Sequence, residues 1–194
     1  KLQSIEVYGI IDRDFRGDHE IDMLKADGIY TLGVAEVENL FVVPELLDIM
    51  ERILGCDTGT AEAAKQFIVE LFDKLKGKQI SEALSKEITF QLSLFDLGNQ
   101  QYTNEEIRKK IEGCYTIENI GIWRTEKEEI FNSANTLPEI LAVFNFKELS
   151  RKISSKFNIS DRDFPKRVIN VLTNNKIVKT ESLSGLSKYI PELP

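Results

Sequence analysis

The residues of this sequence best suited to chemistry lie in two acidic turns. Asp12 and Asp14 follow an apolar run that ends at Ile11, and Glu38 follows the next apolar run along the chain. On a strand, residues i and i+2 point to the same face, so the two aspartates are expected to converge on one cation. Mg²⁺ prefers hard oxygen ligands and usually takes one or two carboxylates from a protein. Glu38 would provide a third oxygen ligand or hold a metal-bound water. The pattern therefore predicts a Mg²⁺ or Mn²⁺ site suited to phosphodiester chemistry.

The same acidic residues also suit a purely structural role. Aspartates at strand ends are common turn formers. Residues 161–164 repeat the four residue types of residues 12–15 and serve as a comparison within the chain. The second copy precedes Pro165 and is typical of a helix N-terminus, with Asp163 as the cap. The repeated pattern thus favours a helix cap in the second copy and leaves metal binding and turn formation open in the first.

Residues 5–39 predict the elements that position the acidic turns. An apolar strand over residues 7–11 is followed by a short helix with Asp18 as N-cap and Gly28 as C-terminal stop. Residues 29–34 form a second apolar, β-branched run. Two strands joined by a helix are expected to be parallel neighbours with a right-handed connection. Both acidic turns would then lie at the carboxyl ends of adjacent buried strands, the edge where open α/β sheets bind ligands.

The remainder of the chain is dominated by helical periodicity. Gly77 is expected to end one of these helices, and the β-branched centre of residues 81–97 leaves a strand open there. The predicted fold class is α/β, a partial parallel βαβ sheet followed by a mainly α-helical annex. We expect an α/β region over residues 1–55, a helical region over 56–145 and a basic helical tail over 146–194. Helices are predicted at residues 45–54, 61–75, 81–97, from Thr103 to about 111, at 126–134, 138–144, 146–157 and 165–172.

Composition narrows the class of protein. The 194 residues are 42% hydrophobic and 29% charged, which is typical of a globular protein. No apolar run approaches the roughly 20 residues of a membrane span, and no signal pattern opens the chain, so we expect a cytoplasmic protein without membrane contact. Cys56 and Cys114 are expected to be free, buried thiols. His19, the only histidine, is expected to be a solvated surface residue, which leaves no case for zinc.

The charge of the chain is unevenly distributed. Residues 147–194 contain ten Lys or Arg against five Asp or Glu, whereas residues 1–146 contain 15 against 27. A basic tail on an acidic body indicates different partners for the two ends. The tail cations either contact a nucleic-acid backbone or form ordinary solvated helix faces. The candidate phosphate contacts are Arg151, Lys152, Lys156, Lys166 and Arg167.

Several stretches resemble a known family. The run YGIIDRDF, a short helix, and then GIYTLGVAEVENLF are similar to the second half of a TOPRIM domain, the metal-binding fold of topoisomerases, bacterial primases and OLD (overcoming-lysogenization-defect) nucleases. The Glu-Asn-Leu after the second run resembles a bacterial family in which an ABC/AAA-type ATPase module precedes an OLD-like TOPRIM segment and a helical tail. FNFKEL and ISSKFNISDRDFPKRVINVL resemble that family's tail.

The resemblance implies roles for individual residues. Asp12 and Asp14 match the Asp-x-Asp metal motif, and Glu38 matches the acidic position after the next strand. A TOPRIM site also uses a glutamate on an earlier strand as general acid or base, and Glu6 does not fit because it lies in the same strand as Asp12. The resemblance therefore implies that this strand, and an ATP-binding module in the same polypeptide, precede Lys1.

Three functions follow as hypotheses. The first is part of an ATP-coupled, Mg²⁺-dependent nuclease that acts on DNA in defence against foreign DNA. The second is a non-catalytic regulatory or assembly module of an ATPase, whose helical annex forms a homodimer or docks the ATPase. The third is primase-like nucleotidyl transfer by the same carboxylates, which is disfavoured because no nucleotide- or template-binding segment is visible.

Overall fold

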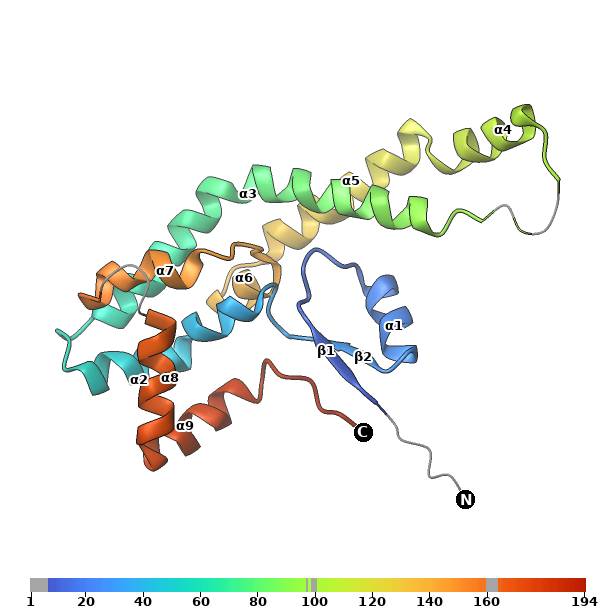
Figure 1. The fold of residues 1–194 in the computed structure, drawn as a ribbon. Coiled ribbons are helices and arrows are strands. Elements are labelled where there is room, and N and C mark those ends of the chain that lie inside the picture. Colours follow the sequence, from blue (N-terminus) through green and yellow to red (C-terminus); the bar gives the residue numbers. More distant parts are fainter. Residues whose placement is uncertain (1–6, 97, 99–100, 160–163) are drawn as a thin grey trace, which may run out of the picture.

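The computed structural model describes residues 7–96, 98, 101–159 and 164–194 (Figure 1). Most of these residues are helical, and a small parallel sheet lies near the N-terminal end of the described chain. The predicted architecture, an α/β unit followed by a helical annex, is confirmed at this level. Asp163 and its neighbours in the second Asp-Arg-Asp copy fall outside the described residues.

The α/β unit consists of β1 (Gly9–Ile11), α1 (Asp18–Ala26) and β2 (Ile29–Thr31). The two strands are parallel, and Ile10 is paired with Tyr30. Gly28 has a φ of 77°, a left-handed conformation that ends α1 without the steric penalty of a side chain. The predicted cap was wrong by one residue: Gly17 is the N-cap of α1, and no side-chain hydrogen bond from the described residues caps it.

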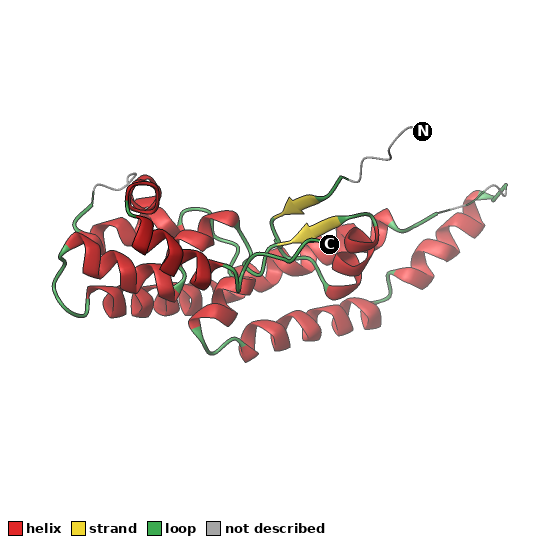
Figure 2. Ribbon diagram, turned by 90° about the horizontal axis from the view of Figure 1, so that it is seen from below, coloured by secondary structure: helices red, strands yellow, loops and turns green. Residues whose placement is uncertain are grey.

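The prediction that the first strand is buried was wrong. Val7 is 80% exposed and Ile10 is 45% exposed. The sheet in the described chain has two strands, which lie side by side in Figure 2 (yellow). Each strand therefore keeps one edge that is not paired with another described strand. The second predicted strand is also shorter than expected, because after Thr31 the chain leaves the β conformation and enters the 3₁₀ helix η1 (Val37–Val42).

The helical annex begins with α2 and the long helix α3. Gly55, with a φ of 64°, ends α2 as predicted. Gly77 does not end a helix: it lies inside α3, because the flanking residues keep good helical propensity and one glycine costs only about 1 kcal/mol. The helix and strand alternatives for residues 81–97 are resolved as helix up to Ser93. The bounds are Pro44–Leu54 for α2 and Thr60–Ser93 for α3.

The next two helices begin at threonine N-caps. Thr103 caps α4 by accepting from the Glu106 backbone N–H, and Glu106 reciprocates in a capping box. Thr116 caps α5, which begins well before the helix predicted at residues 126–134. Figure 1 shows α5 running beside α3, and α4 projecting from the far end of that pair. The bounds are Asn104–Cys114 for α4, Ile117–Ser133 for α5 and Leu137–Val143 for α6.

The basic tail folds back onto the sheet and α2. It forms α7 (Leu149–Ile153), η2 (Ser154–Phe157), α8 (Phe164–Asn174) and α9 (Lys176–Leu186). The last helix was not predicted, since the predicted helices ended at residue 172. Beyond it, the Tyr189 carbonyl accepts the Gly33 N–H at 2.7 Å, so the end of the tail lies beside the segment that follows β2.

One hydrophobic core unites these elements. It includes Val34 next to the sheet, Leu47 of α2, Phe72 of α3, Phe144 after α6 and Val168 of α8. All five are essentially inaccessible to solvent. Residues of the α/β unit, the helical annex and the tail therefore pack together, which fixes the segments after both strands against the helices.

The two cysteines and the histidine lie at or near the surface. Cys56 and Cys114 are free, as predicted, but Cys56 is only partly buried and Cys114 is exposed. His19 is exposed, as predicted. Within the described residues, no helix has the length and apolar character needed to cross a bilayer.

Candidate acidic site

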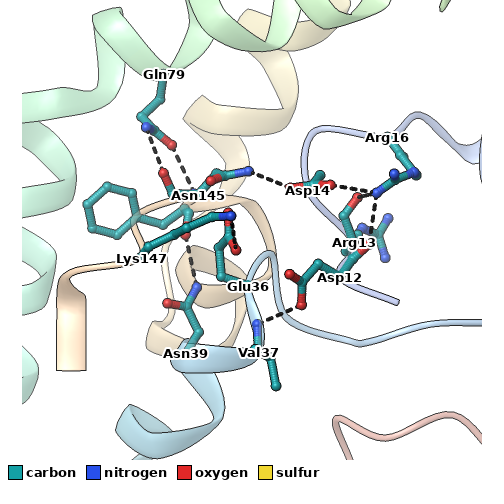
Figure 3. A network of polar contacts seen from close by, with 11 residues as sticks. Asp12, Arg13, Asp14, Arg16, Glu36, Val37, Asn39, Gln79, Asn145 and Lys147 are labelled. Carbon is teal, nitrogen blue, oxygen red and sulfur yellow. Dashed lines mark hydrogen bonds and ion pairs between the residues drawn. The ribbon is translucent and has the colours of Figure 1, made fainter. Parts of the chain in front are cut away.

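The chain segments that follow β1 and β2 are held side by side by hydrogen bonds. The Asp14 N–H donates to the Ala35 carbonyl at 2.8 Å. The Val37 N–H donates to Oδ1 of Asp12 at 2.8 Å, so this carboxylate stabilises the start of η1 (Figure 3). The two predicted acidic turns are therefore neighbours at the carboxyl end of the sheet, where parallel strands place them.

Asp14 lies in a turn and not in the strand. The strand ends at Ile11, and Asp14 has a φ of 51°, a left-handed conformation that is uncommon outside glycine. The expectation that Asp12 and Asp14 point to one face of a strand is therefore wrong, because the alternation rule holds only for extended residues. Asp14 accepts hydrogen bonds from Nη1 of Arg16 at 2.7 Å and from Nδ2 of Asn145 at 3.0 Å.

Asn145 connects Asp14 to the long helix α3. Its backbone N–H donates to Oε1 of Gln79 at 2.9 Å, and its carbonyl accepts from Nε2 of Gln79 at 3.0 Å. Gln79 is itself buried in α3. Its paired hydrogen bonds fix the backbone of residue 145, and the Asn145 side chain then orients the Asp14 carboxylate (Figure 3).

Glu36 is the residue that the sequence interpretation missed. Its side chain is 0% exposed, and neither carboxylate oxygen has a hydrogen-bond partner among the described residues. Nζ of Lys147 lies 3.6 Å from Oε2, but the Lys147 side chain is 68% exposed, so this contact is a weak ion pair. A buried carboxylate without hydrogen bonds is energetically costly, and its retention in a folded chain needs an explanation.

The surroundings of Glu36 alter its acidity. The pKa of Glu36 is raised to about 7, chiefly because its side chain is buried; Lys147 opposes this rise, and the negative charges of Asp12, Asp14 and Glu38 add to it. The four acids thus form one electrostatic cluster. Such a cluster of carboxylates with a perturbed pKa is a recognised sign of a functional site.

Glu38, the predicted third ligand, lies two residues after Glu36 in the chain. It belongs to the first turn of η1, and its buried Oε2 atom has no hydrogen-bond partner among the described residues. A signal for Glu36 was present in the sequence: it is the first acid after the second apolar run, just as Asp12 is the first acid after the first run. Glu36 and Asp12 therefore occupy comparable positions after neighbouring strands.

Asn39 anchors the segment that carries both glutamates. Its Nδ2 atom donates to the carbonyls of Leu141 at 3.2 Å and Phe144 at 2.9 Å. The Ala35 N–H also donates to the Leu141 carbonyl, at 2.8 Å. These bonds fix the acidic segment to the C-terminal end of α6.

The structure does not present a completed metal cage. Within the ranges that the structure describes, no three His, Cys, Asp or Glu side chains are gathered closely enough to hold a metal ion. The donor chemistry nevertheless fits a hard divalent cation, because the oxygens of Glu36 and one oxygen of Glu38 are buried and lack partners. To bind such a cation, the Asp14 carboxylate would have to lose its hydrogen bond from Arg16 or from Asn145.

The five tail cations predicted to contact phosphate have separate surroundings. Arg151 pairs with Glu148 at 3.1 Å, and Nζ of Lys156 lies 5.1 Å from the centre of the Phe67 ring. Lys152, Lys166 and Arg167 are exposed. The tail residue that reaches the acidic site is Lys147, which the sequence interpretation did not select.

Comparisons with known proteins add no assignment. A scan against protein-family models and searches of curated proteins and solved structures found no match to this chain.

Proposed function

We propose that this chain carries the acidic, divalent-cation-binding part of a TOPRIM-like nuclease that acts on nucleic-acid phosphodiesters. The observation that carries the proposal is Glu36: a fully buried carboxylate that accepts no hydrogen bond from the described residues and whose pKa is raised by the charges of Asp12 and Asp14. A cation would compensate the charge that the fold leaves uncompensated. Coupling to ATP hydrolysis in another module, a role in defence, and DNA contact by the basic tail belong to the same proposal.

Each acid has a distinct part in this proposal. Glu36, Asp12 and Asp14 would hold Mg²⁺ or Mn²⁺, which when bound polarises a phosphodiester and activates a nucleophile. Glu38 would contribute its unpaired oxygen or orient a water molecule. Asn145 keeps Asp14 oriented toward the site.

Metal binding by the chain is the first test. Millimolar Mg²⁺ or Mn²⁺ should raise the melting temperature of the wild type, because binding to the folded state alone stabilises it. Glu36→Gln and Asp12→Asn should each remove most of that increase. Asp48→Asn, on the exposed side of α2, is the control and should keep the wild-type response. An equal Mg²⁺ response in all four proteins would contradict the assignment.

Activity is tested separately, by plasmid nicking with the full polypeptide that contains this chain. Nicking that depends on Mg²⁺ or Mn²⁺ and is lost in both Glu36→Gln and Asp14→Asn would support the nuclease. Metal binding without nicking in the presence or absence of ATP would retain the cation site and remove the catalytic function.

A second candidate, a non-catalytic regulatory or assembly module, is favoured by a different observation. The Asp12 carboxylate already accepts the Val37 N–H, and Asp14 already binds Arg16 and Asn145. If these contacts are the whole role of the aspartates, Asp12→Asn should lower stability, and Mg²⁺ should stabilise neither the wild type nor this variant. Light scattering over a range of concentrations would then detect a homodimer if the helical annex assembles.

A further inference from the structure

A separate cavity lies beside the acidic turn, on the side of the helical annex. It is enclosed by the turn of residues 13–18 and by α3, α5 and α6, and its volume is about 80 Å³. A single water molecule needs only about 10–15 Å³ by a comparable measure, so the cavity admits a group of several heavy atoms. Ala83, Phe131 and Val143 supply an apolar wall.

Cationic groups converge on this cavity. Arg13, Arg16 and Lys127 all line it. Lys127 comes from α5, and its side chain is only 7% exposed, which is rare for lysine. The ammonium group has three N–H donors, and Oε2 of Glu87 accepts one of them at 2.7 Å.

The start of α1 lies at the same cavity. Gly17, the N-cap residue, and Asp18, the first helical residue, both line it. The N-terminal end of a helix attracts anions through its backbone N–H groups and its dipole. A Cβ atom on Gly17 would lie 3.5 Å from Oε2 of Glu87 and 3.6 Å from Nζ of Lys127, so the glycine leaves room at the helix end next to the Lys127–Glu87 pair.

The acids near the cavity are already compensated. Asp14 is bound by Arg16 and Asn145, and Glu20 pairs with Arg16 at 2.8 Å. Asp18, whose side chain is 94% exposed, lies 3.5 Å from Nη2 of Arg13, so a phosphate would share Arg13 with this solvated carboxylate. Burial alone would raise the pKa of Glu87, but hydrogen bonds from Gln91 and Lys127 hold that pKa below its ordinary value. Glu87 therefore remains a carboxylate paired with Lys127.

We propose that this cavity binds a phosphate group, held by Lys127, Arg13 and the start of α1, with an attached sugar against the apolar wall. The cavity shares Asp14 with the acidic site, so the phosphate would belong to the nucleic-acid substrate, next to the phosphodiester that reacts. That identification of the source rests on the proposed function, whereas phosphate binding itself does not.

The test uses inorganic phosphate and the whole chain, in EDTA so that no divalent cation contributes. At equal ionic strength, phosphate should raise the melting temperature of the wild type by about 2–4 °C more than chloride does. Phosphate also stabilises folded proteins in general, so the informative quantity is the difference between wild type and variants.

Two variants remove the site by different means. Gly17→Val fills the cavity and keeps every charge, and the φ of −78° at residue 17 accepts any residue type. The double variant Lys127→Met with Glu87→Gln removes the cation without leaving its partner charged in the interior. Both should lose the extra phosphate stabilisation. Gly121→Ala, on α5 with open space around its Cβ, is the control and should keep it.

The outcomes separate the two proposals. An equal phosphate effect in wild type and in whichever of the two variants folds would overturn the cavity assignment, as would no effect in the wild type. A specific phosphate response combined with a flat Mg²⁺ response would retain the cavity and remove the nuclease. A Mg²⁺ response without specific phosphate binding would retain the cation site and overturn the phosphate cavity.

Discussion

The sheet edge buries Glu36, and the α3–α5 helix pair largely buries Glu87. The two glutamates differ in their hydrogen bonds and in the direction of their pKa shifts. Glu87 of α3 accepts from Nζ of Lys127 at 2.7 Å and from Nε2 of Gln91 at 2.9 Å. Glu36 accepts no hydrogen bond from the described residues, and its nearest cation, Lys147, is mostly exposed. The pKa of Glu87 is lowered and that of Glu36 is raised. Glu87 and Lys127 thus form a hydrogen-bonded scaffold pair in the interior, whereas Glu36 has one weak ion pair among the described residues.

The largest effect is expected from breaking the scaffold pair. Glu87→Gln leaves the Lys127 ammonium buried without a compensating charge, which typically costs about 3–5 kcal/mol of unfolding free energy. Urea denaturation at pH 7 measures it. Glu128→Gln, which breaks the exposed Arg124–Glu128 pair on the same helix as Lys127, should change stability by less than about 1 kcal/mol. Similar losses in both variants would remove the distinction between buried and exposed pairs.

The next effect concerns Glu36 and depends on pH. Its pKa is about 7 in the folded chain and 4.5 ordinarily, so between these values the folded state binds more protons than the unfolded state. Stability is therefore lost as the pH rises from about 4.5 to 7, by up to about 3 kcal/mol. Glu36→Gln should lack this loss. Urea denaturation of both proteins at several pH values provides the measurement, and parallel profiles would show that Glu36 is not an uncompensated acid.

The smallest effect is expected at Gly77 and shows whether the long helix α3 is continuous there. Gly77 lies inside α3, and a Cβ atom there would meet nothing within 4 Å. Gly77→Ala should therefore raise the unfolding free energy by about 1 kcal/mol. Gly185→Ala in α9 is the opposite case, because its Cβ would lie 2.8 Å from Cβ of Glu45. A loss of stability in Gly77→Ala would indicate that the helix is interrupted there.

Local signals account for what could be predicted about the fold. The parallel βαβ unit follows from two apolar runs separated by a helix-length segment, and the start of α4 follows from Thr103 and Glu106. The break at Gly77 was predicted wrongly, because a glycine is a weak helix stop and its neighbours favour continuation. The last helix, α9, has one local signal, the N-cap Asn175 that accepts the Val178 N–H, and it packs against α2 and α8.

The candidate site could likewise be predicted from the sequence only in part. Residue type and position after a strand were enough to select Asp12 and Asp14 and to place them near the second acidic turn. The choice of Glu38 over Glu36 could not be settled by these signals, because both are acids after the same apolar run. Burial distinguishes them, because Glu36 is fully buried and Glu38 only partly, and the segment that carries both is bound to Leu141, more than a hundred residues away in the chain.

The sequence by itself determined the local elements and the acidic character of the sheet edge, since both depend on neighbouring residues. Only the tertiary structure decided which acid is left without partners and which cations surround it. Desolvation and ion pairing are set by distant segments that pack together, such as Gln79 and Asn145 behind Asp14, and Lys127 beneath Gly17. No local pattern encodes those contacts.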